Sequence, residues 1–267
     1  MHPKGRPPTQ SRMFGLRNKN GSCWINAALQ SVFRIPDLQS RFSNNDEDDS
    51  NPIEVCLAEL WGSKGDEGLK SFYECVKTSP HMPAGEGIGD SHELIEFLCD
   101  KVPFLDKLMR FRVVQSIQCK HCWTTESKPD TMHEFSIVPS TKKQTVSDTI
   151  AEAVRPHEIP DWKCEKCSHR GCTKQLLLAE FPQILTFHMV SVGTSVSYTP
   201  VLVLNGIKYA LFAIVCYTGG HWYTWGRNLP PGNPWCRLDD SHVQTYSPTR
   251  MPLDDSMRFL MYYRLNQ

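Results

Sequence analysis

Two Cys-x-x-Cys pairs constrain the fold of this chain more than any other feature. Cys119 and Cys122 form the first pair, Cys164 and Cys167 form the second, and 41 residues separate them. Each pair adjoins strand-like sequence and polar turn residues, and four thiolates suit a tetrahedral Zn²⁺ site. We therefore predict that a structural zinc ion joins two β-hairpins into an extended projection. A thioredoxin-like dithiol is the alternative, but no βαβ pattern surrounds either pair. Three neighbouring residues could replace a ligand, namely His121, His169 and Cys172.

Length and charge limit the class of protein. The chain has 267 residues, of which 40% are hydrophobic and 22% are charged, enough for a substantial core. A net charge of +0 argues against a basic face for nucleic acid, and no apolar run approaches the roughly 18 residues of a membrane span. No signal peptide is visible, so the 11 cysteines fit a reducing compartment. We expect a cytoplasmic or nuclear monomer without nucleic-acid or membrane partners.

Apolar periodicity divides the chain into a helical first third and a strand-rich remainder. Residues 1–12 are polar and proline-containing, and we interpret them as a disordered lead. Helical spacing follows Cys23 and recurs over 53–61 and 91–98. From Phe111 onward, mainly alternating patterns predict antiparallel strands. This order predicts an α+β protein of two packed layers, with a cleft between them.

Cys23 lies where the first predicted helix begins. Asn20-Gly21 favours a turn before it, and Ser22 suits the N-cap position. Free backbone N–H groups and the positive end of the helix dipole favour a thiolate there, and they can stabilise an oxyanion. A buried structural cysteine is the alternative interpretation of this stretch alone.

A candidate base and its orienting carboxylate lie near the end of the chain. His221 follows two glycines and opens an aromatic strand, and Asp239-Asp240 ends another strand. A thiol nucleophile needs a base, and an imidazole base needs a carboxylate or amide to fix its tautomer. Neighbouring strands would place His221 beside Asp239. Alone, each could be a half-buried histidine or a solvated turn, but the order Cys, His, Asp favours a catalytic set.

These stretches resemble the ubiquitin-specific proteases. Residues 15–30 resemble the family's cysteine box, and 220–225 with 235–243 resemble its histidine box and aspartate. Residues 90–94 resemble the short element between them, and 175–187 resemble the segment after the second Cys pair. The two Cys pairs resemble the family's zinc-binding fingertips. The parts occur in the family's order and cover almost the whole chain.

The resemblance implies a papain-like fold with a catalytic domain over residues 13–267. Its helical thumb would span about 13–109, its zinc-bearing fingers about 110–180 and its β palm about 181–267. The fingers would grip a ubiquitin fold, and the C-terminal tail of ubiquitin would reach the thiol through the cleft between thumb and palm.

The resemblance also implies a role for each matching residue. Cys23 would be the nucleophile, His221 the general base, Asp239 its orienter and Asn18 an oxyanion stabiliser. The expected substrate-binding residues are Asp90, Asp240 and Trp222.

The implied activity is that of a cysteine isopeptidase, which removes ubiquitin or a ubiquitin-like modifier from lysines through an acyl-enzyme. An isopeptidase specific for SUMO or another modifier and an inactive modifier-binding module are the alternatives. A zinc-ribbon scaffold for nucleic acid is a weaker one, because the net charge is +0.

Several positions depart from the family pattern. Asn20 stands in place of a usual glycine, Trp24 and Trp222 in place of tyrosines, and Gly89 in place of a glutamine. Met189-Val190 replaces a usual basic pair. We expect these departures to affect the choice of modifier more than the chemistry.

Overall fold

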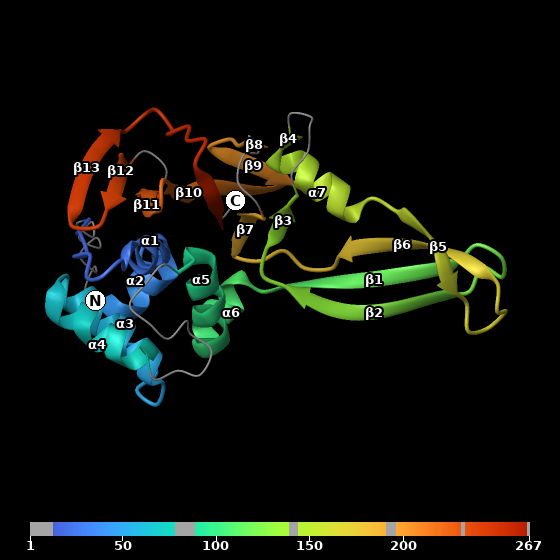
Figure 1. Cartoon of the computed structure of the whole chain (residues 1–267), viewed down its shortest axis with the longest axis horizontal. Helices are drawn as coiled ribbons and strands as arrows, with labels where there is room; N and C mark the ends of the chain where they lie inside the picture. The colour runs from blue at the N-terminus through green and yellow to red at the C-terminus, as the bar shows by residue number, and fades with distance from the viewer. Residues whose placement is uncertain (1–12, 78–88, 139–143, 191–195, 231–232, 266–267) are drawn as a thin grey trace, which may run out of the picture.

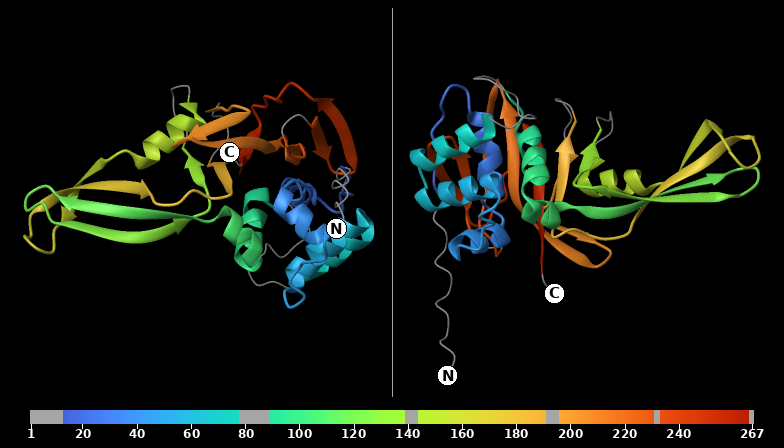
Figure 2. Two further views of the ribbon diagram at one scale, coloured as in Figure 1. Left: turned by 180° about the vertical axis from the view of Figure 1, so that it is seen from behind. Right: turned by 90° about the horizontal axis from the view of Figure 1, so that it is seen from below.

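The computed structural model describes residues 13–77, 89–138, 144–190, 196–230 and 233–265. Helices from the first part of the chain and strands from the last part lie against each other at one end, and a long β projection extends from the other end (Figures 1 and 2). This arrangement confirms the predicted α+β class. The predicted disordered lead, residues 1–12, lies outside the described residues. Among those residues, no helix is long and apolar enough to cross a membrane.

The helical region follows local signals in the sequence. Proline occupies the first position of three of its helices, where its fixed φ suits the helix and its missing N–H costs nothing. Asn51 and Asp90 cap two helices by accepting hydrogen bonds from first-turn amides. The helices are α1 (Cys23–Val32), α2 (Pro36–Ser43), α3 (Pro52–Ser63), α4 (Asp66–Lys77), α5 (Ser91–Lys101) and α6 (Pro103–Met109).

The projection is a four-stranded antiparallel sheet, here called the finger sheet, with the order β2-β1-β6-β5. Cys119 pairs with Cys172 across β1 and β6, near the far end. One of the two edge strands, β2, carries Lys128 and Pro129, which suit an unpaired edge. The strands are β1 (Phe111–Cys119), β2 (Thr125–Met132), β5 (His157–Lys163) and β6 (Arg170–Leu178).

An eight-stranded sheet, here called the main sheet, packs against the helices. Its order is β13-β12-β11-β10-β14-β7-β3, and β9 pairs with β10. Most neighbours are antiparallel, as predicted, whereas β3 and β7 are parallel. The strands are β3 (Phe135–Ile137), β7 (Ile184–Met189), β9 (Val201–Leu204), β10 (Ile207–Thr218), β11 (His221–Gly226), β12 (Trp235–Asp239), β13 (His242–Ser247) and β14 (Met257–Arg264). A short helix, α7 (Val146–Val154), and the parallel pair β4 (Gln144–Thr145) and β8 (Val196–Ser197) complete the fold.

The first helix lies between the other helices and the main sheet. All ten residues of α1 are buried, so other parts of the protein surround it on every side. It packs against β11, where the Thr224 hydroxyl donates a hydrogen bond of 2.7 Å to the Ala27 carbonyl oxygen. The hydrophobic core thus holds α1, and with it Cys23, at a fixed position on the sheet.

Replacing Leu29 should reveal how much this packing stabilises the fold. Leu29 is 0% exposed within α1, and a buried Leu→Ala change costs about 2–5 kcal/mol because it leaves a cavity. We expect a loss of that size for Leu29→Ala in denaturant unfolding. The control Leu253→Ala, at a side chain that is 78% exposed, should change the free energy of unfolding by less than about 0.5 kcal/mol. Equal effects of the two changes would contradict the packing described here.

Candidate active site

A tight loop leads into α1 and places Cys23 as its first residue. Asn20 and Gly21 have φ angles of 53° and 82°, and both asparagine and glycine adopt this left-handed conformation readily. The Cys23 thiol is 6% exposed and donates to the Gly21 carbonyl oxygen at 3.9 Å. The thiol therefore lies at the helix N-terminus, where backbone N–H groups converge.

Ser22 occupies the N-cap position, but the prediction that its side chain suits a cap is not met. No side-chain hydrogen bond caps α1, because the Ser22 hydroxyl instead accepts a hydrogen bond of 2.9 Å from the Lys19 amide. The Ser22 amide in turn donates to Asn18 Oδ1 at 3.0 Å. These bonds order the loop and leave the first amides of the helix without a side-chain acceptor from Ser22.

His221 and Asp239 lie side by side, as the sequence predicts. They sit at the same end of the neighbouring strands β11 and β12, and His221 Nε2 is 2.6 Å from Asp239 Oδ1. Arg237 Nη2 contacts the other carboxylate oxygen of Asp239 at 3.0 Å. Because Asp239 occupies Nε2, the nitrogen of His221 left for proton transfer is Nδ1.

Asp240 links the loop before α1 to this end of the main sheet. Its carboxylate accepts hydrogen bonds from Asn18 Nδ2 at 2.9 Å and from Asn26 Nδ2 at 2.8 Å. Its backbone oxygen accepts from the Leu16 amide at 2.8 Å. Cys23 and Asn26 are three residues apart and so share a face of α1. The thiol therefore lies on the side of the helix that faces Asp239 and Asp240, although 215 residues separate Cys23 from Asp239 in the chain.

The orientation of the Asn18 amide follows from its two partners. Its oxygen accepts from the Ser22 amide and its nitrogen donates to Asp240. An amide nitrogen carries two hydrogens, so one remains to serve as a donor toward an oxyanion at Cys23. The roles predicted for Asn18 and Asp240 remain predictions.

The other two predicted substrate-binding residues differ in exposure. Asp90 is half-buried, and its carboxylate caps α5 by accepting from the His92 amide at 2.8 Å. Trp222 is only 6% exposed and packs on Tyr217, with 4.8 Å between ring centroids. Contact of either residue with a substrate remains a prediction.

Sequence reasoning missed two residues that belong to this neighbourhood. Asn26 is 1% exposed and holds Asp240, and a polar residue three positions after Cys23 in a helix expected to be buried was the available signal. Tyr73 reaches the loop from α4, where burial raises the pKa of its hydroxyl to about 12 and Asp240 and Cys23 add to the rise. The sequence carries no comparable signal for Tyr73.

The four cysteines of the two pairs meet at the far end of the finger sheet. Their sulfur atoms all lie within 4.8 Å of one another. Cys119 Sγ is 3.7 Å from Cys167 Sγ, and Cys122 Sγ is 3.7 Å from Cys164 Sγ. Four sulfurs at about 2.3 Å from a tetrahedral ion lie about 3.8 Å apart, so the geometry fits Zn²⁺. The three neighbouring residues considered as replacement ligands are not part of this four-residue group.

A thiol at the N-terminus of a helix that packs against a strand bearing an imidazole paired with a carboxylate is the arrangement of a cysteine hydrolase of the papain type. A family model described as ubiquitin carboxyl-terminal hydrolase matches residues 14–262. The chain therefore belongs to the ubiquitin carboxyl-terminal hydrolase family, a family of cysteine proteases.

Curated relatives are distant and much longer. Human ubiquitin carboxyl-terminal hydrolase 24 is 24% identical over 213 residues, which cover 70% of this chain and 8% of that protein. Human ubiquitin carboxyl-terminal hydrolase 42 is 22% identical over 304 residues, covering 94% of this chain and 23% of that protein. The chain thus spans less than a quarter of the length of each.

Solved structures share the fold across nearly the whole chain. Ubp8 in the SAGA DUB module with Sgf11, Sus1 and Sgf73, bound to monoubiquitin, superposes with a TM-score of 0.83 at 17% identity. The alignment covers 98% of this chain and 72% of that one. The same module bound to ubiquitin aldehyde gives a TM-score of 0.81 at 17% identity, with 98% and 72% coverage. The fold is accordingly that of the ubiquitin-specific proteases.

Gly15 offers a test of the link between the loop and the sheet. A Cβ atom at this position would lie 2.3 Å from the Ser241 carbonyl oxygen, so the backbone must shift. We expect Gly15→Ala to lower the free energy of unfolding by about 1–3 kcal/mol and to slow alkylation of Cys23, measured by peptide mapping. Gly62→Ala is the control, because nothing lies within 4 Å of a Cβ there. A harmless Gly15→Ala would show that the loop is not held against Ser241.

Proposed function

We propose that this chain is a thiol-dependent isopeptidase that cleaves the bond between the C-terminal glycine of ubiquitin and a lysine amine. The observation that carries the proposal is the position of Cys23 on the face of α1 that bonds to Asp240, next to the His221–Asp239 pair. Family membership supports it, as do similar structures with bound ubiquitin or ubiquitin aldehyde.

We propose one task for each group. His221 takes the thiol proton, and Cys23 Sγ attacks the glycine carbonyl carbon to form a tetrahedral intermediate. Backbone amides at the start of α1 and the free hydrogen of the Asn18 amide stabilise its oxyanion. His221 then gives its proton to the leaving lysine amine, and the acyl-enzyme forms.

Hydrolysis of the acyl-enzyme uses the same groups in reverse. His221 now takes a proton from water, which attacks the thioester carbonyl and releases ubiquitin. Asp239 holds the His221 ring through Nε2 and stabilises its charged form in both half-reactions. Asp90, at the start of α5, is proposed to hold the extended tail of ubiquitin, and Asp240 to hold Asn18 in place.

A reactive probe with a ubiquitin C-terminal electrophile tests this proposal. We expect wild type to gain one adduct, found by peptide mapping on Cys23, and Cys23→Ala to gain none while remaining folded. Cys56→Ala, at a partly buried cysteine elsewhere, should react like wild type. A probe panel with other modifiers identifies the preferred one. An adduct on Cys23→Ala would overturn the assignment, whereas a binding-only protein would leave wild type unmodified.

Removing the base should abolish turnover without preventing ubiquitin binding. We expect His221→Ala to lower kcat by at least about 10³-fold, because the thiol then lacks its proton acceptor. Steady-state hydrolysis of a fluorogenic ubiquitin substrate measures the loss. The control His242→Ala removes an exposed histidine on β13, and its kcat should stay within about twofold of wild type. Similar losses in both variants would exclude His221 as the base.

We further propose that Zn²⁺ occupies the four-cysteine group as a structural ion. The group offers four thiolate ligands without a carboxylate, so the ion would cross-link the two hairpins and leave no position open for catalysis.

Elemental analysis of protein purified without chelator tests the zinc proposal. We expect about one zinc per chain in wild type and none in Cys164→Ser, whose thermal unfolding midpoint should also fall. Cys172→Ser provides a matched control, since Cys172 is buried beside Cys119 but outside the group. If Cys172→Ser loses its zinc and Cys164→Ser keeps it, the ligands include Cys172 and not Cys164.

The proposal also retains the predicted domain division and location. The helices would form a thumb over about 13–109, the finger sheet would lie within about 110–180, and the main sheet would form most of a palm over about 181–267. We also propose a monomer that works in the cytoplasm or nucleus; the abundant cysteines without disulfides among the described residues support the reducing location.

A further inference from the structure

A second group of titratable side chains lies away from Cys23, at the junction of the helices and the main sheet. Glu134, between β2 and β3, places one carboxylate oxygen 2.8 Å from His92 Nε2 and the other 3.3 Å from His188 Nδ1. The two imidazole rings are stacked, with centroids 3.6 Å apart and planes 11° from parallel. One carboxylate thus joins histidines from α5 and β7.

This cluster is well enclosed and rigidly supported. The three side chains are only 15–18% exposed. Phe259 of β14 lies beside both rings, at 5.8 Å from His92 and 6.2 Å from His188. The Thr186 hydroxyl of β7 also donates to the His133 carbonyl oxygen, which fixes the backbone next to Glu134. Glu134 therefore moves with the main sheet.

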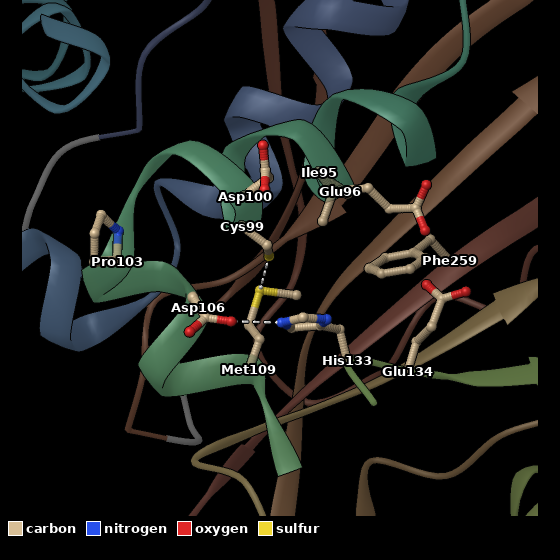
Figure 3. A pocket seen from close by; sticks show the side chains of 10 residues that line it. All are labelled: Ile95, Glu96, Cys99, Asp100, Pro103, Asp106, Met109, His133, Glu134 and Phe259. Carbon is tan, nitrogen blue, oxygen red and sulfur yellow. Dashed lines mark hydrogen bonds and ion pairs between the residues drawn. The ribbon is translucent and has the colours of Figure 1, made fainter. Parts of the chain in front are cut away.

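Other charged groups surround the cluster. Glu96 of α5 lies 3.7 Å from His92 Nε2, and Asp90 adds negative charge at the start of the same helix. A cavity of about 380 Å³ borders Glu134 (Figure 3). On its other side His133 and Asp106 of α6 form a separate pair at 2.7 Å.

These surroundings set the charge states. Burial alone would raise the pKa of Glu134, but hydrogen bonds from His188 and His92 lower it to about 2. Burial alone would lower the pKa of His92, but the hydrogen bond and charge of Glu134, with Glu96 and Asp90, raise it. Glu134 is therefore a carboxylate at neutral pH, and His92 carries more positive charge than a free histidine.

We propose that Glu134 is a positioning residue for substrate binding: by holding the stacked His92 and His188 rings, it fixes the first turn of α5, and with it Asp90, against the main sheet. The Asp90 carboxylate bonds to the His92 amide, so the side chain of His92 and the carboxylate of Asp90 share one anchored turn. This inference rests on the proposed function, because it takes Asp90 to hold the ubiquitin tail.

The proposal has a defined dependence on pH. At a pH below the raised pKa of His92, the contact between His92 and Glu134 is an ion pair. As the pH rises through that pKa, the imidazole becomes neutral and the interaction weakens. Affinity for the ubiquitin tail should therefore fall on the alkaline side. Glu134 stays ionised down to a pH of about 2, so its own titration does not weaken the tie near neutral pH.

Binding measurements in the Cys23→Ala background test the role of Glu134 without turnover. We expect Glu134→Ala to weaken binding of full-length ubiquitin about tenfold, the effect of losing one hydrogen bond to a charged group. Binding of ubiquitin that lacks its C-terminal tail should not change. Glu134→Gln, which keeps the shape but not the charge, should bind better than Glu134→Ala and lose the pH dependence. His133→Gln is the matched control and should bind like the parent.

Amide hydrogen exchange gives a second measurement that needs no ubiquitin. We expect Glu134→Ala to speed exchange in the first turn of α5 several-fold, while His133→Gln leaves it unchanged. Unchanged exchange and unchanged tail-dependent binding would overturn the proposal, as would equal weakening of tailed and tail-less ubiquitin. If the Cys23→Ala parent binds no ubiquitin at all, the proposed function fails, and the exchange rates alone decide whether Glu134 fixes α5.

Discussion

The candidate active site depends on the contacts of one carboxylate, that of Asp240. It accepts hydrogen bonds from Asn18 in the loop before α1 and from Asn26 within α1, while its backbone oxygen accepts from Leu16. Each bond to a partly exposed carboxylate contributes on the order of 1 kcal/mol. Their larger effect is geometric, because they join the thiol-bearing loop to the strand end that carries Asp239. Asp240 adopts a φ of 51°, so the turn that presents its carboxylate is itself sharply bent.

Local sequence patterns predicted the parts of the fold that local energetics decide. The helical periodicity after Cys23 and the alternation after Phe111 each reflect which face of an element is buried. The spacing of the two cysteine pairs predicted that four thiols meet, since paired Cys-x-x-Cys spacings without a βαβ pattern favour one tetrahedral metal site. The pairing of His221 with Asp239 followed because neighbouring strands bring their ends together.

Contacts between distant segments could not be predicted in the same way. Ser22 looked like a helix cap, but the competing Lys19 amide is visible only once the loop is folded. Nothing near Asn26 in the chain indicates that its partner is Asp240. The Glu134 cluster likewise combines three segments with no common motif. In each case the two interacting groups become neighbours only after the chain has folded, so a local sequence pattern does not reveal the contact.

Two departures from the family pattern explain each other in the structure. A Cβ atom at Gly89 would lie 2.4 Å from the indole ring of Trp24. The indole ring of Trp24 therefore occupies the space that a side chain at position 89 would need. Glycine at position 89 leaves room for this ring. Met189 is buried at 3% exposure at the end of β7, whereas Val190 is 56% exposed. At position 189 an apolar side chain is therefore buried in the core, and at position 190 an apolar side chain takes the place of a charged one at the surface.

Several hydrogen bonds between the helices and the main sheet lie close to the side chains that must be aligned for the proposed reaction. Asp240 bonds to the loop that precedes Cys23. Thr224, which follows His221 by three residues on β11, bonds to α1. Glu134 bonds to His92 in the turn that bears Asp90. Apolar packing is not directional and would tolerate small sliding between the layers, whereas a hydrogen bond fixes distance and angle. Some polar contacts lie elsewhere, such as that between Tyr263 and Asp37. The apolar core thus supplies most of the stability, and these three ties fix the layers where a thiol, its base and a bound peptide tail must align.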